Sequence, residues 1–94
     1  MRACKNIVGP TVRRLRNAAG MSQPDFAILC QRLGWDVSRE VLAQIESQRR
    51  YVTDWELTVL ARALEVDLEA LFASAFKRRS GSVPGMGQLP GKQN

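Results

Sequence analysis

The sequence contains a series of helix-start signals at short intervals, and these signals limit the chain to short helices. Ser22, Ser38, Thr53 and Asp67 each precede apolar residues spaced as on one face of an amphipathic helix. Thr53 and Glu56 also fit the capping-box pattern S/T-x-x-E. The β-branched residues are scattered rather than gathered in strand-like runs. The sequence therefore predicts an all-α fold.

We expect five helices within residues 10–76, joined by short loops into a compact bundle. The first runs from Pro10 to Ala19, because proline suits the first helical position and Gly20 stops the helix. The inward residues recur at helical spacing: Val12, Leu15 and Ala19 in the first helix; Phe26, Leu29, Cys30 and Leu33 in the second, which Gly34 ends; Val41 or Leu42 and Ile45 in the third; Leu57, Leu60, Ala61 and Leu64 in the fourth; and Leu68, Leu71, Phe72 and Ala75 in the fifth.

The chain divides into three parts. Residues 1–9 form an N-terminal arm, residues 10–77 form the helical domain, and residues 78–94 form a basic, Gly- and Pro-rich tail. The segment SGSVPGMGQLPGKQN, from Ser80 on, lacks the apolar residues that a packed core needs. We therefore expect the tail to be flexible and disordered.

Charge is distributed unevenly along the chain. The formal net charge is +5, yet all nine acidic residues lie between Asp25 and Glu69. Residues 10–53 hold seven arginines and four acids, a net of +3, whereas residues 54–76 hold one arginine and five acids, a net of −4. A body with one basic end and one acidic end suits a polyanion that binds on one face only. The cluster Lys77-Arg78-Arg79 either adds non-specific DNA affinity or is a solvated helix end.

Several classes of protein lack their usual signals here. The chain has no histidine and only two cysteines, Cys4 and Cys30, so we expect no zinc site or other metal site and no cofactor. Cys30 fits a buried small residue and Cys4 a residue of the arm. No phosphate-loop or G-x-G-x-x-G motif supports an enzyme. No apolar run could span a membrane or serve as a secretory signal, which predicts a cytoplasmic protein.

The third helix has the layout of a DNA-recognition helix. Because its larger apolar residues point inward, Arg39, Glu40, Ala43 and Gln44 share the opposite side near the N-terminal end. The first turns of a recognition helix enter the major groove, where such side chains face base edges. Arginine can bond guanine and glutamine can bond adenine. Glu40 could accept from cytosine, pair with Arg39, or repel the DNA backbone, and Ala43 could touch a thymine methyl or simply favour the helix.

The segments VRRLRNAAGMSQ (12–23), SREVLAQIE (38–46) and ELTVLARALEVDLEALF (56–72) resemble the lambda-repressor-like (Cro/XRE-type) helix-turn-helix family. The resemblance covers about two-thirds of the chain and implies a five-helix bundle with a helix-turn-helix. It also implies roles for individual residues. Base contacts fall to Arg39, Glu40 and Gln44, phosphate contacts to Gln23, Arg49 and Arg50, and a partly buried ion pair between the first and third helices to Arg16 and Glu46. From the residues themselves, we add Ala43 to the expected base contacts and Ser38 and Tyr51 to the expected phosphate contacts.

Other residues keep two interpretations each. Tyr51 could donate its hydroxyl to a phosphate or pack on the domain, and Arg13 and Arg14 could also reach the DNA backbone. Trp35 could pack over the second helix or form part of a dimer contact. We expect Trp55, at the start of the fourth helix, to be half-buried.

Two features depart from the family. The distance from the Ser-Gln start of the second helix to the Ile-Glu end of the third is about five residues longer than is usual there. The added residues lengthen either the second helix or the turn around Gly34, Trp35 and Asp36. Gln48 stands where the family usually has glycine, so a left-handed backbone there would carry some strain.

These features predict a cytoplasmic, sequence-specific regulator that inserts helix 38–48 into the major groove of double-stranded DNA and has no catalytic activity. The resemblance implies a homodimer on an inverted-repeat operator, acting most often as a repressor. The alternative is a module that binds a protein partner, such as an antitoxin subunit that also binds its own operator.

Overall fold

The computed structural model describes residues 4–72, and the predicted all-α fold class is confirmed there. Four helices follow one another: α1 (Gly9–Ala18), α2 (Gln23–Arg32), α3 (Arg39–Glu46) and α4 (Asp54–Leu64). Residues 68–72 are also helical, and no strand occurs between residues 4 and 72. The predicted tail 78–94, with the cluster Lys77-Arg78-Arg79, lies outside the described residues.

The helices begin where side chains cap their first turns. Ser22 and Thr53 each form a complete capping box, with Asp25 and Glu56 respectively, and Ser38 accepts the N–H of Val41 at the start of α3. Each cap satisfies a backbone donor that the helix itself leaves unpaired. These local hydrogen bonds fix three helix starts within one residue of the prediction.

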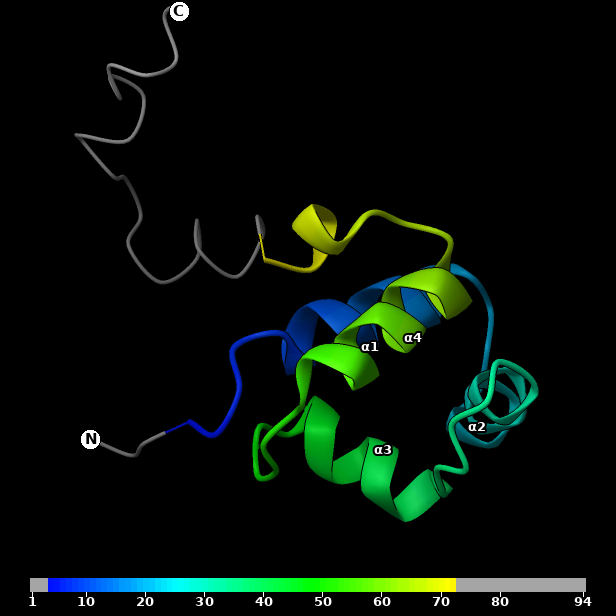
Figure 1. Cartoon of the computed structure of the whole chain (residues 1–94), viewed down its shortest axis with the longest axis horizontal. Helices are drawn as coiled ribbons and strands as arrows, with labels where there is room; N and C mark the ends of the chain where they lie inside the picture. Colours follow the sequence, from blue (N-terminus) through cyan, green and yellow to red (C-terminus); the bar gives the residue numbers. More distant parts are fainter. Residues whose placement is uncertain (1–3, 73–94) are drawn as a thin grey trace, which may run out of the picture.

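The helices pack around one apolar core. Helix α1 contacts α3 and α4, and α2 contacts the same two helices. Figure 1 shows α3 along one edge of the molecule, below α1 and α4, with the yellow segment 68–72 at the opposite edge. The largest fully buried side chains are Phe26, Leu42, Ile45, Leu60, Leu71, Val8, Val12, Thr11 and Cys30. Helix α3 is therefore fixed by its packing against this close-packed core.

The packed body begins before the predicted start at Pro10. Val8 is buried, and α1 starts at Gly9, whose N–H donates to Asn6 Oδ1 at 2.7 Å. Because Asn6 accepts this first N–H of α1 and the N–H of Lys5 donates to the carbonyl oxygen of Gln48, the segment assigned to an arm joins the body from Lys5 on. Ala19, predicted to face inward, is an exposed cap residue.

Three further expectations need correction. The predicted recognition helix 38–48 ends at Glu46, because Gln48 turns left-handed with φ 65°. Leu33 follows the last residue of α2 and is 39% exposed rather than inward. Leu68 is also more exposed than its place in the apolar pattern predicted, at 42%.

Candidate nucleic-acid interface

Helix α3 separates its apolar and polar residues cleanly. Leu42 and Ile45 are fully buried, whereas Arg39, Glu40 and Gln44 are exposed. Ala43 lies at the boundary and is partly buried. The four residues predicted to contact bases therefore share the side of the helix that faces away from the core.

Arg39 and Glu40 form a weak ion pair on this surface. Arg39 Nη2 lies 3.4 Å from Glu40 Oε2, and the side chains are 50% and 70% exposed. An exposed pair of this kind contributes at most about 1 kcal/mol to stability. Of the interpretations open for Glu40, the free protein adopts the pairing with Arg39. A DNA ligand could exchange this contact at little cost.

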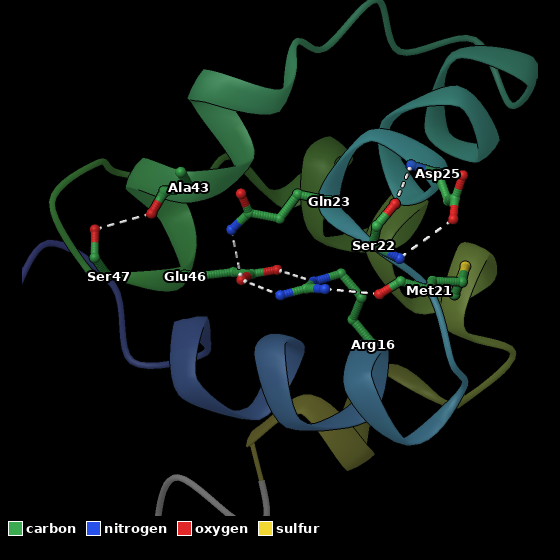
Figure 2. A network of polar contacts seen from close by, with 8 residues as sticks. All are labelled: Arg16, Met21, Ser22, Gln23, Asp25, Ala43, Glu46 and Ser47. Carbon is green, nitrogen blue, oxygen red and sulfur yellow. Dashed lines mark hydrogen bonds and ion pairs between the residues drawn. The ribbon is translucent and has the colours of Figure 1, made fainter.

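Arg16 and Glu46 form a buried, two-pronged ion pair between α1 and α3 (Figure 2). Arg16 Nε donates to Glu46 Oε2 at 2.7 Å and Nη2 donates to Oε1 at 3.0 Å. The remaining Nη1 donates to the carbonyl oxygen of Met21 at 2.7 Å. The hydrogen bond to Glu46 raises the pKa of Arg16 above its ordinary value, so the guanidinium stays charged despite its burial.

Gln23 joins this network from the first turn of α2. Its Nε2 donates to Glu46 Oε1 at 3.0 Å, so the last turn of α3 is tied to both α1 and α2 (Figure 2). The carboxylate of Glu46 thus sets the relative position of three helices. Sequence reasoning assigned Gln23 to a phosphate and missed this contact, because no periodic pattern links residues 23 and 46.

The loop between α3 and α4, residues 47–53, carries three of the predicted phosphate contacts. Arg49 is exposed and its Nε donates to Ser47 Oγ at 2.9 Å. Tyr51 is 69% exposed, which excludes the packed alternative for its ring. Arg50 is more restrained, because its Nη1 donates to Glu56 Oε1 at 3.2 Å. Arg49 and Tyr51 are therefore the side chains of this loop most available to a ligand.

Gln48 adopts the left-handed conformation that the family usually gives to glycine. A non-glycine residue with φ 65° carries strain of roughly 1–2 kcal/mol. Its side chain makes a contact that glycine cannot make, because Nε2 donates to the carbonyl oxygen of Asn6 at 3.0 Å. The N–H of Lys5 also donates to the carbonyl oxygen of Gln48, at 3.2 Å. Asn6 and Lys5 therefore lie against the loop after α3, where sequence reasoning did not place them.

The lengthened connection between α2 and α3 is an ordered segment. Helix α2 has ten residues, and residues 33–38 lead from it to α3. Gln31 Nε2 donates to the carbonyl oxygen of Val37 at 2.7 Å, and Val37 is buried. Trp35 is 8% exposed and meets Trp55 edge-on, with ring centroids 6.5 Å apart. Trp55 is half-exposed, as predicted, and Trp35 packs inside its own chain rather than at a free surface.

On α1, Arg13 and Arg14 are exposed. Together with Pro10, Asn17 and Glu46 they line a shallow hollow of about 380 Å³ beside α3. Within residues 4–72 no group of three or more His, Cys, Asp or Glu side chains could hold a metal ion. None of the helices in the same range is long and apolar enough to cross a membrane.

Comparisons with known proteins agree with this geometry. A family model described as a helix-turn-helix domain matches residues 7–74. The chain is similar to the restriction-modification controller protein C.AhdI from Aeromonas hydrophila, with 30% identity, a TM-score of 0.62, and coverage of 70% of this chain and 92% of that chain. It is also similar in fold to the clp gene regulator ClgR from C. glutamicum, with 18% identity, a TM-score of 0.73, and coverage of 87% of this chain and 100% of that chain. No curated protein matches significantly.

Proposed function

The chain belongs to the helix-turn-helix family of DNA-binding transcription regulators, and we propose that it reads a specific DNA sequence by inserting α3 into the major groove. One observation carries this proposal. The polar residues of α3 are exposed on one side, while the opposite side is fully buried and anchored by the pair of Arg16 and Glu46. A helix held in this way presents its side chains to base edges at fixed positions.

Each residue on the outer side of α3 suits a different base. Arg39 can donate two hydrogen bonds to guanine O6 and N7, and Gln44 can bond adenine N6 and N7. Glu40 can accept from cytosine N4 once it leaves Arg39, and Ala43 can contact a thymine methyl. We propose that these four residues read the operator.

Phosphate contacts would position α3 on the duplex. Ser38, Arg49 and Tyr51 are exposed near the two ends of α3. Gln23 suits the same role, because its amide has two N–H donors and Glu46 accepts from one. Arg50 could also reach a phosphate if its contact with Glu56 opens.

We further propose a homodimer on an inverted repeat, which would place the half-sites about 34 Å or a multiple of that distance apart. Its activity would be binding rather than catalysis, and occupancy of a promoter would repress transcription. We also propose that it acts in the cytoplasm.

Selection of bound sequences from a random duplex library tests the proposal. We expect one palindromic consensus. Each single substitution, Arg39→Ala or Gln44→Ala, should lower the preference for one base of each half-site by about 1–3 kcal/mol. Arg49→Ala should instead weaken binding to all sequences alike.

The control is Arg32→Ala, which removes an exposed arginine from the last turn of α2. We expect this variant to keep the consensus. DNA binding without any consensus would show that α3 does not read bases. Absence of DNA binding would overturn the proposal and favour a protein partner, as for an antitoxin-like module.

A further inference from the structure

The N-terminal segment, residues 4–8, is held against the loop that follows α3. Asn6 makes the central contacts: its Nδ2 donates to the carbonyl oxygen of Ile45 at 3.1 Å and to that of Arg50 at 2.8 Å. Its Oδ1 accepts the N–H of Gly9. One side chain therefore joins the end of α3, the far side of the loop and the start of α1.

The loop reaches back to the same segment. Gln48 Nε2 donates to the carbonyl oxygen of Asn6 at 3.0 Å, and the N–H of Lys5 donates to the carbonyl oxygen of Gln48 at 3.2 Å. Five hydrogen bonds thus involve Asn6 or its neighbour Lys5. This is more than is needed to cap α1, because four of them involve the last residues of α3 or the loop.

These contacts set Lys5 beside the exposed side chain of Tyr51. Lys5 Nζ lies 5.1 Å from the centroid of the Tyr51 ring, a cation–π arrangement. Lys5 forms no ion pair with any carboxylate of residues 4–72. Its charge is therefore available to an anion at the edge of the loop.

We propose that Lys5 contacts the DNA backbone next to Tyr51 and that Asn6 is the positioning residue for this edge of the interface. This inference rests on the proposed function and adds to it a basic contact from outside the helix-turn-helix. A phosphate that accepts a hydrogen bond from the Tyr51 hydroxyl would lie beside the ammonium of Lys5. Asn6 holds the loop backbone from which Arg49 and Tyr51 project.

The test compares how binding depends on salt. Each lost phosphate contact lowers the slope of log K against log[salt] by about 0.9 in magnitude. The probe is the highest-affinity duplex selected from the random library, together with a mixed-sequence duplex of the same length. We expect Lys5→Gln to lower the slope on both duplexes by about 0.9 for each bound protomer, or about 1.8 for the proposed dimer. Arg62→Gln removes one charge from the last turn of α4 and should leave the slope unchanged.

Asn6 needs a separate readout, because its loss also weakens the fold. Asn6→Ala should lower the slope by more than Lys5→Gln does, since Lys5 and Arg49 both lose their positions and each carries a charge that would neutralise a phosphate. Leu64→Ala, at the far end of α4, serves as a matched destabilised variant that should keep the wild-type slope. Both variants are measured well below their melting temperatures.

The outcomes separate this inference from the proposed function. If the wild-type protein binds its consensus with a steep salt slope and Lys5→Gln keeps that slope, Lys5 is not a backbone contact. If Asn6→Ala also keeps the slope, the segment only supports the fold. If the wild-type protein binds neither duplex, the proposed function and this inference both fail.

Discussion

The buried carboxylate of Glu46 ties α3 to α1 and α2. Its side chain is 3% exposed and accepts two hydrogen bonds from Arg16 and one from Gln23. A buried carboxylate is stable only while such donors replace the water that it has lost. Breaking the pair would leave a buried charge without its partner, and this cost exceeds the stabilisation that the attraction within the pair provides.

Arg16→Ala should destabilise the protein strongly. The substitution leaves Glu46 buried with Gln23 as a donor, and breaking a buried pair in this way costs about 3–5 kcal/mol. For a domain of this size each kcal/mol lowers the melting temperature by about 4–8 °C. Circular dichroism during heating measures the shift. Arg13→Ala, on the same helix but exposed, is the matched control, and equal shifts for both variants would contradict the structural role of the pair.

The two cysteines should differ in reactivity. Burial raises the pKa of the Cys30 thiol to about 11, whereas Cys4 is exposed. The thiolate is the reactive form, so one thiol should react with an alkylating reagent in the folded protein at pH 8 and two after unfolding. Cys4→Ser should abolish the reaction of the folded protein. A second thiol reacting at the same rate in the folded protein would contradict the burial of Cys30.

The raised pKa also predicts how stability changes in alkali. The folded protein holds the Cys30 proton more tightly than the unfolded chain, whose thiol has the ordinary pKa of 9.0. The contribution of the neutral thiol is therefore complete below pH 9.0 and is lost as the pH rises toward about 11. Cys30→Ala should remove this part of the pH dependence in denaturant titrations.

At the scale of the helices, the contact between α1 and α3 is unusually close. A Cβ atom on Gly9 would overlap the carbonyl oxygen of Ile45 and lie 2.9 Å from that of Glu46. Only a residue without a side chain lets the start of α1 cross the end of α3 here. Gly9 therefore helps to set how α1 and α3 pack against each other.

Gly9→Ala should destabilise the protein although alanine is the better helix former by about 1 kcal/mol. The added methyl group meets backbone atoms that cannot move aside, and such overpacking costs typically about 1–3 kcal/mol. Urea unfolding measures the change. Gly20→Ala is the control, because a Cβ there meets nothing within 4 Å and only its φ of 74° opposes the substitution. A more stable Gly9→Ala protein would mean that the two helices are not in close contact.

The helices could be predicted well because their signals are local. Ser22, Ser38 and Thr53 cap the turns that directly follow them, so reading a few residues is enough to find each start. Asn6 and Gln23 could not be placed in this way. Their partners, Ile45, Arg50 and Glu46, lie 23–44 residues further along the chain, and a single polar side chain leaves no periodic pattern in the sequence.

The same limit applies to the candidate site. The outward face of α3 follows from the inward positions of Leu42 and Ile45, which helical spacing fixes. The path of the residues between α2 and α3 depends instead on Trp35 meeting Trp55 across the fold. The sequence shows that this connection is about five residues longer than is usual in the family. The path of the added residues could not be derived from the sequence.

At the scale of the whole molecule, the division of charge predicts how the protein approaches DNA. The acidic region after residue 53 includes Glu65 and Glu69, which are exposed. Helix α3 and the segment that carries Glu69 lie at opposite edges of the molecule (Figure 1). We therefore expect the acidic edge to repel the DNA backbone and the edge that carries α3 to attract it.

The double variant Glu65→Gln, Glu69→Gln should therefore strengthen DNA binding only at low salt. Neutralising these carboxylates reduces a long-range repulsion, which acts over about 30 Å at 0.01 M salt but only about 8 Å at 0.15 M. Arg49→Gln should differ in kind, because it would remove a proposed phosphate contact and so weaken binding across the whole salt range. Fluorescence anisotropy with the selected duplex, measured from low to physiological salt, distinguishes the two effects. An equal gain for the double variant at every salt concentration would mean that the acidic edge lies against the DNA, and the proposed orientation would then be reversed.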